Sequence, residues 1–521
     1  GTSVSILEGG LVYSRHASTS IDISSGTFLH VLSGSAVTAG ADFDYSTGAP
    51  VADLTGNDAD ITLDSSMELL VGGSVTASRG LNLTTGGSTQ DSNNSFAGYF
   101  DGIPGDDHYL HGHRGFGFML TGTLTTLMDN YDIQAGASED VIVRGNVNVL
   151  GSGGDLSLQS DKWIYWEGFA DVAGNIGIYG GLETDLTDRG GSDADGSSVY
   201  VHSTSQLVTS ASGTSVNIYG SKDLDIFGAI LPGGSFGENG AEFSGPDSTA
   251  HLEAGQQIYL DTSVTAAKTV ELVAGEAGAD DERLSIVLGS AAGLTSAGYT
   301  SDDSGGLVDI DAGTDVQLMG YVTAGANVTQ TFDEDGDLES QTYDWSEETG
   351  TIQITAGGQV MTGGETTSLA GETVEVGGHI TARDSIEIDG GENPDEKGVY
   401  VPGAAELVVH QADGSIDIDA AQNTHILGLL VSGGEVQTYY DSNGQRLGRQ
   451  IDYYDGDSTV SVQAEGKVII GQDIAAGKTI DLIGGGTGDD GKGMVLQGSV
   501  QMQTWRPDSR INVSGKGDID I

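Results

Sequence analysis

A short apolar cassette recurs along nearly the whole chain and constrains its fold more than any other feature. In the copy that starts at Ile310, apolar residues fall at Val316, Leu318, Val322 and Val328, with small residues at Ala312, Gly313, Gly320 and Ala324. Copies that start at Leu252 and Val462 keep this frame residue for residue. Other copies lie near Ile23, Leu63, Val141, Ile218, Val374, Ile418 and Val513.

Apolar residues that alternate over a few positions indicate short strands with one buried face, and Ala or Gly at the ends of these strands indicates tight corners. A single strand of this kind cannot bury its apolar face alone. Stacking successive coils about 4.8 Å apart supplies hydrogen-bond partners and closes the core. A hairpin meander is the alternative, but it needs a reversing turn such as Asn-Gly after each strand. We therefore predict an all-β fold, an elongated parallel β-helix or β-solenoid with side hairpins and loop insertions.

Composition agrees with many tight turns, since the 521 residues include 84 glycines and only 7 prolines. Disorder is the rival explanation for so much glycine and acid, but it does not predict recurring runs of Val, Ile and Thr. A single compact core stops growing near roughly 250–300 residues. We expect one continuous solenoid over 1–521, a fragment of a longer chain, with insertions at about 91–118, 186–198, 331–348 and 438–457.

Two cassettes carry a resemblance to a known family. They run from Gly378 through His379, Ile380, Thr381 and Ala382 to Ile388, and from Gln472 through Ile474 and Ala476 to Leu482. This pattern resembles the repeat of filamentous-haemagglutinin-type adhesins, giant bacterial surface proteins with a parallel β-helix shaft. The resemblance implies a right-handed β-helix, export to the cell exterior, and a role in adhesion or as a filament shaft.

The charge balance limits the partners. Lys and Arg number 19 and Asp and Glu 77, which gives a formal net charge of −58. Nucleic acid is excluded as a partner because a phosphate backbone needs clustered cations. The acidity has two readings, solubility in a salty medium and binding of divalent cations. The chain has no cysteine, and no apolar run in it is long enough to form a transmembrane segment.

A longer repeat lies over the cassettes, because residues 308–360 and 416–468 match at a constant offset of 108. Both copies insert a segment that we expect to form a β-hairpin with a tip of Asp-Gly or Asn-Gly type. The insertions are rich in aromatic residues, which either cover the adjacent coils or bind a ligand or partner. The candidate partner-binding residues are Phe332, Tyr343, Trp345, Tyr439, Tyr440, Tyr453 and Tyr454.

Metal ligands are a separate expectation. Hard Ca²⁺ takes clustered carboxylate and carbonyl oxygens, and acidic residues gather at the two expected hairpin tips. The candidate calcium ligands are Asp333, Asp335, Asp337, Asp441 and Asn443. Three histidines, His108, His111 and His113, lie close together in an insertion and form either a transition-metal site or part of a surface loop.

Outward carboxylates raise a further expectation. Asp309 and Asp311 flank Ile310, and Asp417 and Asp419 flank Ile418. Like charges on neighbouring coils would lie near 5 Å apart and repel each other. Stability should therefore depend on salt or divalent ions.

The sequence favours a protein that is not an enzyme, because it contains no nucleophile elbow, P-loop or His-Glu-x-x-His motif. We expect an extracellular, secreted or cell-surface adhesive rod that binds a cell-surface glycan or protein. The alternatives are a filament or sheath subunit that assembles with other copies of itself, and a polysaccharide-acting β-helix enzyme or tailspike.

Overall fold

The computed structural model describes most of the chain. The described residues are 3–14, 19–40, 42–44, 49–51, 58–86, 116–181, 197–237, 240–275, 284–290, 292–301, 304–332, 338–345, 350–356, 359–367, 373–391, 397–440, 446–486 and 491–520. They divide into two compact units, Gly1–Ser235 with Leu252–Gly255 and Phe236–His251 with Gln256–Ile521. Every regular element in the described residues is a strand. Accordingly, no described segment is a helix with the length and apolarity that a membrane crossing requires.

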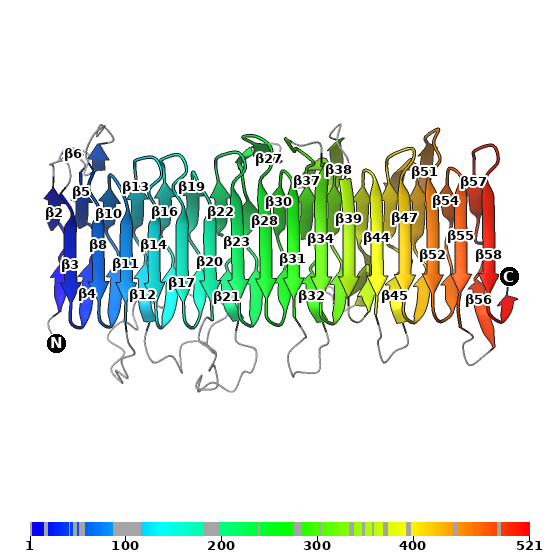
Figure 1. Cartoon of the computed structure of the whole chain (residues 1–521), viewed down its shortest axis with the longest axis horizontal. Coiled ribbons are helices and arrows are strands. Elements are labelled where there is room, and N and C mark those ends of the chain that lie inside the picture. Colours follow the sequence, from blue (N-terminus) through cyan, green and yellow to red (C-terminus); the bar gives the residue numbers. More distant parts are fainter. Residues whose placement is uncertain are drawn as a thin grey trace. The chain divides into compact units, whose positions relative to one another are not determined.

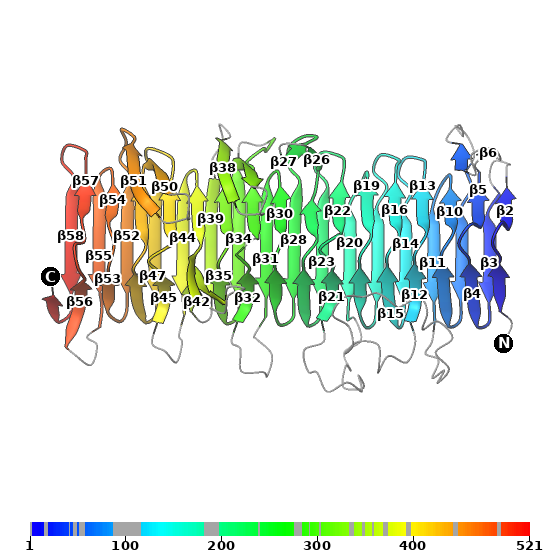
Figure 2. The same ribbon diagram turned by 180° about the vertical axis from the view of Figure 1, so that it is seen from behind.

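In the first unit the chain passes in turn through three parallel sheets, A, B and C, whose strands lie side by side in Figures 1 and 2. Sheet A contains β1 Val4–Ile6, β4 Phe28–Val31, β9 Glu68–Val71, β12 Phe116–Leu120, β15 Asp140–Val143, β18 Ile164–Trp166, β21 Ser197–Val201 and β24 Asp223–Ile226. Sheet B contains β2 Leu11–Ser14, β5 Ala36–Ala39, β10 Ser74–Ala77, β13 Thr123–Thr126, β16 Asn146–Val149, β19 Phe169–Val172, β22 Gln206–Thr209 and β25 Ala229–Leu231. Sheet C contains β3 Ile21–Ser25, β8 Ile61–Ser65, β11 Leu81–Thr85, β14 Ile133–Ala137, β17 Leu156–Ser160, β20 Ile176–Gly180 and β23 Ser215–Gly220.

The second unit repeats the three-sheet arrangement. Its sheet A contains β29 Ile258–Leu260, β32 Leu284–Leu288, β35 Asp315–Leu318, β40 Val360–Met361, β45 Lys397–Val401, β48 Asn423–Ile426, β53 Val468–Ile470, β56 Lys492–Leu496 and β59 Asp518–Asp520. Its sheet B contains β30 Ser263–Ala266, β33 Gly293–Ser296, β36 Tyr321–Ala324, β43 His379–Ala382, β46 Glu406–Val409, β49 Leu429–Ser432, β54 Ile474–Ala476 and β57 Met502–Thr504. Its sheet C contains β31 Thr269–Ala274, β34 Gly306–Ala312, β39 Gly350–Ala356, β44 Ser385–Gly390, β47 Ser415–Ala420, β52 Thr459–Ala464, β55 Thr479–Gly484 and β58 Arg510–Gly515.

The core consists of inward-facing aliphatic ladders in parallel register. In sheet C of the second unit, Ile310 pairs with Ile354 and Ile418 pairs with Val462. Each of these four residues is at most 2% exposed. Deleting such a side chain to alanine costs about 2–5 kcal/mol, so the ladders are a large stabilising contribution. The predicted parallel β-helix is confirmed, whereas its right-handedness remains an implication of the family resemblance.

Asp and Asn side chains link successive coils at the corners. Their side-chain oxygens accept hydrogen bonds from backbone N–H groups one coil further on, which the parallel strands do not themselves satisfy there. The donor and acceptor pairs are Gly80 and Asp60, Ser152 and Asp129, Asp155 and Asp132, Asn175 and Asp155, Ser215 and Asn175, Gln359 and Asp315, Asp457 and Asp413, Lys467 and Asn423, and Gln501 and Asp473.

Antiparallel hairpins interrupt the coils. The pairs are β6 Asp42–Asp44 with β7 Ala49–Val51, β37 Ala326–Phe332 with β38 Leu338–Trp345, β41 Gly363–Thr367 with β42 Thr373–Gly377, and β50 Gly434–Tyr440 with β51 Arg446–Tyr453. Residues 234–254 contain β26 Gly234–Gly237 and β27 Gly240–Phe243, which pair with each other, and β28 Thr249–Ala254, which is a strand of sheet C.

Three assignments to the cassette are wrong. Val374 was expected in a stacked strand, but it lies in β42, which pairs antiparallel with β41. Val328 and Val436 likewise belong to hairpins β37–β38 and β50–β51. The alternating pattern cannot separate the two cases, because a hairpin with one covered face has the same period as a stacked strand.

The two repeated hairpins have the same strand bounds when one is shifted by 108 residues. Hairpin β37–β38 spans 326–332 and 338–345, and hairpin β50–β51 spans 434–440 and 446–453. Both begin directly after a glycine with positive φ, Gly325 at 85° and Gly433 at 81°. A residue with a Cβ seldom adopts this conformation, so glycine allows the chain to turn out of sheet B here.

Candidate functional site at the second hairpin

The candidate partner-binding residues lie in the two repeated hairpins. Trp345 pairs with Ala326, Tyr343 with Val328, Tyr439 with Gly448 and Tyr440 with Arg446, and Phe332 ends β37. Tyr453 and Tyr454 lie at the return of the second hairpin. The calcium candidates Asp333, Asp335, Asp337, Asp441 and Asn443 fall outside the described residues, as do His108, His111 and His113.

Hairpin β50–β51 packs on the outer face of sheet B. Val436 and Ile451 of the hairpin pack against Leu429, Val431 and Ala475. Strand alternation puts Leu429 and Val431 on the outer face, because Leu430 between them continues the inner ladder. Val431 is nevertheless fully buried. The hairpin therefore has an apolar underside that covers an apolar strip of the sheet.

An ion pair also joins the hairpin to the sheet. Arg449 Nη2 of β51 lies 2.7 Å from Glu406 Oε1 of β46, and the two side chains are only 13% and 11% exposed. The other carboxylate oxygen, Oε2, lies 3.7 Å from Nδ1 of His379 on β43. Burial lowers the pKa of His379 and Arg449 lowers it further, while Glu406 opposes both effects. His379 is accordingly neutral at pH 7.

Tyr454 forms a second polar contact at the return of the hairpin. Its hydroxyl donates to Glu435 Oε2 at 3.3 Å and lies 3.5 Å from both ring nitrogens of His410. Burial and the nearby Glu435 carboxylate raise the pKa of Tyr454 to about 12. Burial also lowers the pKa of His410, with Glu435 acting in the opposite direction and Arg383 in the same direction.

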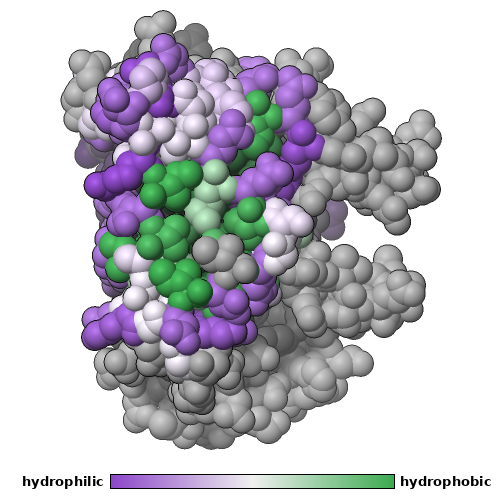
Figure 3. Space-filling model, turned by 90° about the vertical axis from the view of Figure 1, so that its right-hand side faces the viewer, coloured by the Kyte–Doolittle hydropathy of each residue, from purple (hydrophilic) through white to green (hydrophobic). Residues whose placement is uncertain are grey.

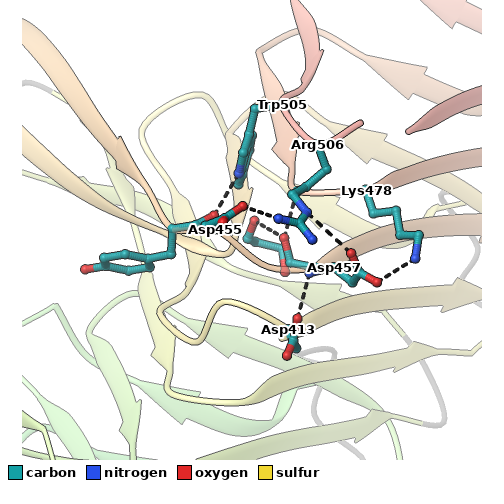
Figure 4. Close-up of polar contacts among 10 residues, drawn as sticks. Asp413, Asp455, Asp457, Lys478, Trp505 and Arg506 are labelled. Atoms are coloured by element: carbon teal, nitrogen blue, oxygen red, sulfur yellow. Dashed lines mark hydrogen bonds and ion pairs between the residues drawn. The ribbon is translucent and has the colours of Figure 1, made fainter. Parts of the chain in front are cut away.

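Trp505, which follows β57, contacts the return of the hairpin (Figure 4). Its Nε1 donates to the carbonyl oxygen of Tyr454 at 2.8 Å. Its ring centroid lies 4.2 Å from that of Tyr453, which is 36% exposed. Trp505 also packs against the apolar cluster beneath the hairpin. Tyr453 and Trp505 thus form an aromatic pair whose position is held by both packing and a hydrogen bond.

Charged residues border this aromatic pair. Arg506 pairs with Asp455, whose side chain is 86% exposed, and lies 3.5 Å from Asp457 (Figure 4). Lys478 Nζ donates to Asp457 at 2.5 Å. The hydrogen bond from Lys478 lowers the pKa of Asp457, and Arg506 contributes in the same direction. The border offers carboxylate oxygens and paired cations to solvent beside an aromatic surface.

Acidic side chains also stack on the outer face of sheet C. Glu387 pairs in register with Asp417, and Asp389 with Asp419. The expectation of adjacent carboxylates is met by these pairs. Asp309 and Asp417, however, do not lie on adjacent strands, because β39 and β44 come between them. Among the residues that the structure describes, no three His, Asp or Glu side chains are arranged to hold a metal ion.

The sequence did not identify Glu406, His379, His410, Arg449 or Trp505 as members of this site. The strand register does indicate the position of Trp505. Ser432 pairs with Ala476, and Ala476 pairs with Thr504, which is the residue before Trp505. The offset of 108 gives no hint of the ion pair. Gln341 stands in the first hairpin where Arg449 stands in the second.

Comparison with known proteins adds no relative, because no family model, curated protein or solved structure matches the chain. The β-helix fold agrees with the filamentous-haemagglutinin-type resemblance, but membership of that family stays a proposal.

Proposed function

We propose that the chain is an extracellular structural and adhesive shaft, part of a surface adhesin or cell-surface filament that mediates attachment. The observation that carries the proposal is the fixed aromatic pair of Tyr453 and Trp505 with its border of charged side chains. A partner would meet this surface on a scaffold whose shape does not depend on the partner. We propose no enzymatic activity.

The stacked coils suit such a role physically. Each coil contacts only its neighbours, and stability is then approximately a sum of coil and interface contributions. Side hairpins can be added at the corners without disturbing the inner ladders. In this arrangement the coils provide the mechanical support and the hairpins contact the partner.

The chemistry of the surface indicates a cell-surface glycan or protein as the partner. Exposed Tyr and Trp side chains supply contact area at low entropic cost, and nearby carboxylates accept hydrogen bonds from hydroxyl or amino groups. The net charge of −58 disfavours polyanions. Secretion to the cell surface follows from the proposed role.

Binding of the labelled chain to cells and to a glycan array tests the proposal. Tyr453→Ala with Trp505→Ala should reduce binding about tenfold or more, as loss of central aromatic contacts usually does. Phe169→Ala is the matched control, because Phe169 is 37% exposed on sheet B of the first unit. Equal binding by all three proteins, with unchanged melting curves, would remove the aromatic pair from the proposal.

A second candidate function is self-association into a filament or sheath. The last strands, β58 and β59, leave Ile511 and Ile519 each 43% exposed. Figure 3 shows hydrophobic residues gathered on this face inside a hydrophilic border. Such a face can pack against further coils, either of the same chain or of another copy. Electron microscopy of the purified chain separates the candidates, because self-association predicts joined particles without ligand.

A further inference from the structure

Two histidines lie where hairpin β50–β51 is attached to sheet B. His379 lies beside the carboxylate of Glu406 that holds Arg449, and His410 lies beside Tyr454 at the return of the hairpin. Both contacts join residues of the hairpin and its return to residues of β43, β46 or the corner after β46. A change of charge at either histidine therefore acts on how the hairpin is held.

At His379, a proton would add a second cation to an occupied site. The neutral imidazole leaves the Glu406 carboxylate and the Arg449 guanidinium as a balanced pair with little exposure. A charged imidazolium would compete with Arg449 for Glu406 and give the three groups a net positive charge. The side chains of Glu406 and Arg449 are only 11% and 13% exposed, so an added charge beside them is unfavourable, while the 42% exposure of the His379 side chain reduces that penalty.

At His410, the charged neighbours come from both sides of the contact. Glu435 of β50 faces the ring and would stabilise a proton, whereas Arg383, after β43, would oppose it. The Tyr454 ring meets the imidazole edge to face, with centroids 5.0 Å apart and planes at 72°. Burial outweighs Glu435, so the pKa of this histidine lies below its ordinary value while the hairpin is docked.

We propose that hairpin β50–β51 is an acid-released strap, in which protonation of His379 and His410 loosens its hold on sheet B and uncovers Leu429, Val431 and Ala475. The sign follows from linkage. In the docked hairpin the pKa of each imidazole lies below its ordinary value, so an undocked state in which the ordinary value is restored binds more protons and gains population as pH falls. This inference goes beyond the proposed adhesive function and does not depend on it.

The chain contains its own control in hairpin β37–β38. This hairpin has the same backbone spans at the offset of 108 and lies against β33 as β50 lies against β46. Gln341 stands in place of Arg449, Gly293 in place of Glu406 and Ala297 in place of His410. At these three positions the first hairpin and its neighbouring strand therefore have no ionisable side chain, and we expect its docking to respond less to acid.

Hydrogen–deuterium exchange of the full chain at pH 7.5 and pH 5.0, corrected for the intrinsic exchange rate, tests the strap. Protection of amides in Glu435–Tyr453 should fall about threefold to thirtyfold for each histidine that becomes protonated on opening. Protection of Ala326–Trp345 should stay within about twofold. In the His379→Gln, His410→Gln double variant, the protection of each hairpin should be the same at pH 7.5 and at pH 5.0. Equal loss in both hairpins of the unaltered chain, or a response that survives in the double variant, would overturn the proposal.

A second measurement leaves both histidines in place. The chain has no cysteine, so Val431→Cys introduces a single thiol under the second hairpin and Thr323→Cys one at the equivalent position under the first. Both positions are fully buried. Alkylation relative to a free thiol should rise at least about threefold on acidification for Val431→Cys alone. Equal pH responses of the two variants would contradict the strap.

Discussion

The carboxylate Oδ1 of Asp155 accepts a hydrogen bond from the backbone N–H of Asn175 at 2.6 Å, one coil further on. The same pattern continues in both directions, because Asp132 accepts from the Asp155 N–H and Asn175 accepts from the Ser215 N–H. The corners of the first unit are therefore held together by a side-chain ladder as well as by the sheets.

We expect Asp155→Ala to lower the free energy of unfolding by about 1–2 kcal/mol, because it leaves a backbone donor without its charged acceptor. Asp155→Asn should recover most of the loss, since Asn175 performs the same task with an amide oxygen. Urea unfolding measures both variants. An alanine variant as stable as the unaltered protein would show that water satisfies the donor equally well.

Gly433→Ala should destabilise the second unit by about 1–3 kcal/mol, because φ is 81° and an added Cβ would lie 2.4 Å from Ser458 Oγ. That hydroxyl already donates to the Ser432 carbonyl and accepts from the Gly477 N–H. Thermal unfolding provides the measurement. Gly136→Ala is the control, since an added Cβ there meets nothing within 4 Å and its φ is not positive.

The stacked carboxylates on sheet C, Glu387 with Asp417 and Asp389 with Asp419, predict that stability depends on pH and salt. Burial raises the pKa of Asp389, and Asp419 and Glu387 raise it further. The folded protein then holds this proton to higher pH than the unfolded chain does, so the carboxyl favours folding in acid and loses that contribution as pH rises through the folded-state pKa. Asp389→Asn should stabilise the protein by about 0.3–0.5 kcal/mol at pH 7 and low salt, and by less at pH 3 or in 1 M NaCl.

Asp22→Asn is the comparison for that variant, because Asp22 pairs in register with uncharged Thr62. It should change stability little at any salt concentration. If Asp389→Asn instead lowers the melting temperature at pH 7, like-charge repulsion is not what determines the contribution of this ladder.

Calcium binding at the hairpin tips remains a prediction. If Asp333, Asp335 and Asp337 hold Ca²⁺, the melting midpoint should rise with calcium at fixed ionic strength, because a ligand that binds only the folded state stabilises it. The triple Asp→Asn variant should abolish that rise. A midpoint that is the same in chelator and in millimolar calcium would count against a specific site.

Sequence periodicity was sufficient to predict the coils, because each inward residue such as Ile310 or Ile418 repeats the chemistry of its neighbours. It also indicated the repeated hairpins through the offset of 108, but it placed their starts near 331 and 438, whereas the hairpin strands begin at Ala326 and Gly434. The clamp of Arg449 and Glu406 was not predictable in this way. It joins residues that lie on different strands, and the first repeat has Gln341 and Gly293 at the equivalent positions.

The contact between Trp505 and Tyr453 was missed for a related reason. The two residues lie in different copies of the cassette, and insertions of unequal length separate the copies. Only the strand register shows that Thr504 continues the ladder of Ser432. Sequence spacing alone therefore cannot identify side-chain contacts that cross from one coil to another.

The offset of 108 residues has a consequence for how such a protein can change in size. Strand β34 and its equivalent β47 carry the same inward pattern and present matching edges to the strands on either side. A duplicated or deleted segment of this length would leave every remaining edge with a partner of the right shape. Reach could thus be lengthened or shortened in whole modules during evolution or engineering, without a new core having to be invented.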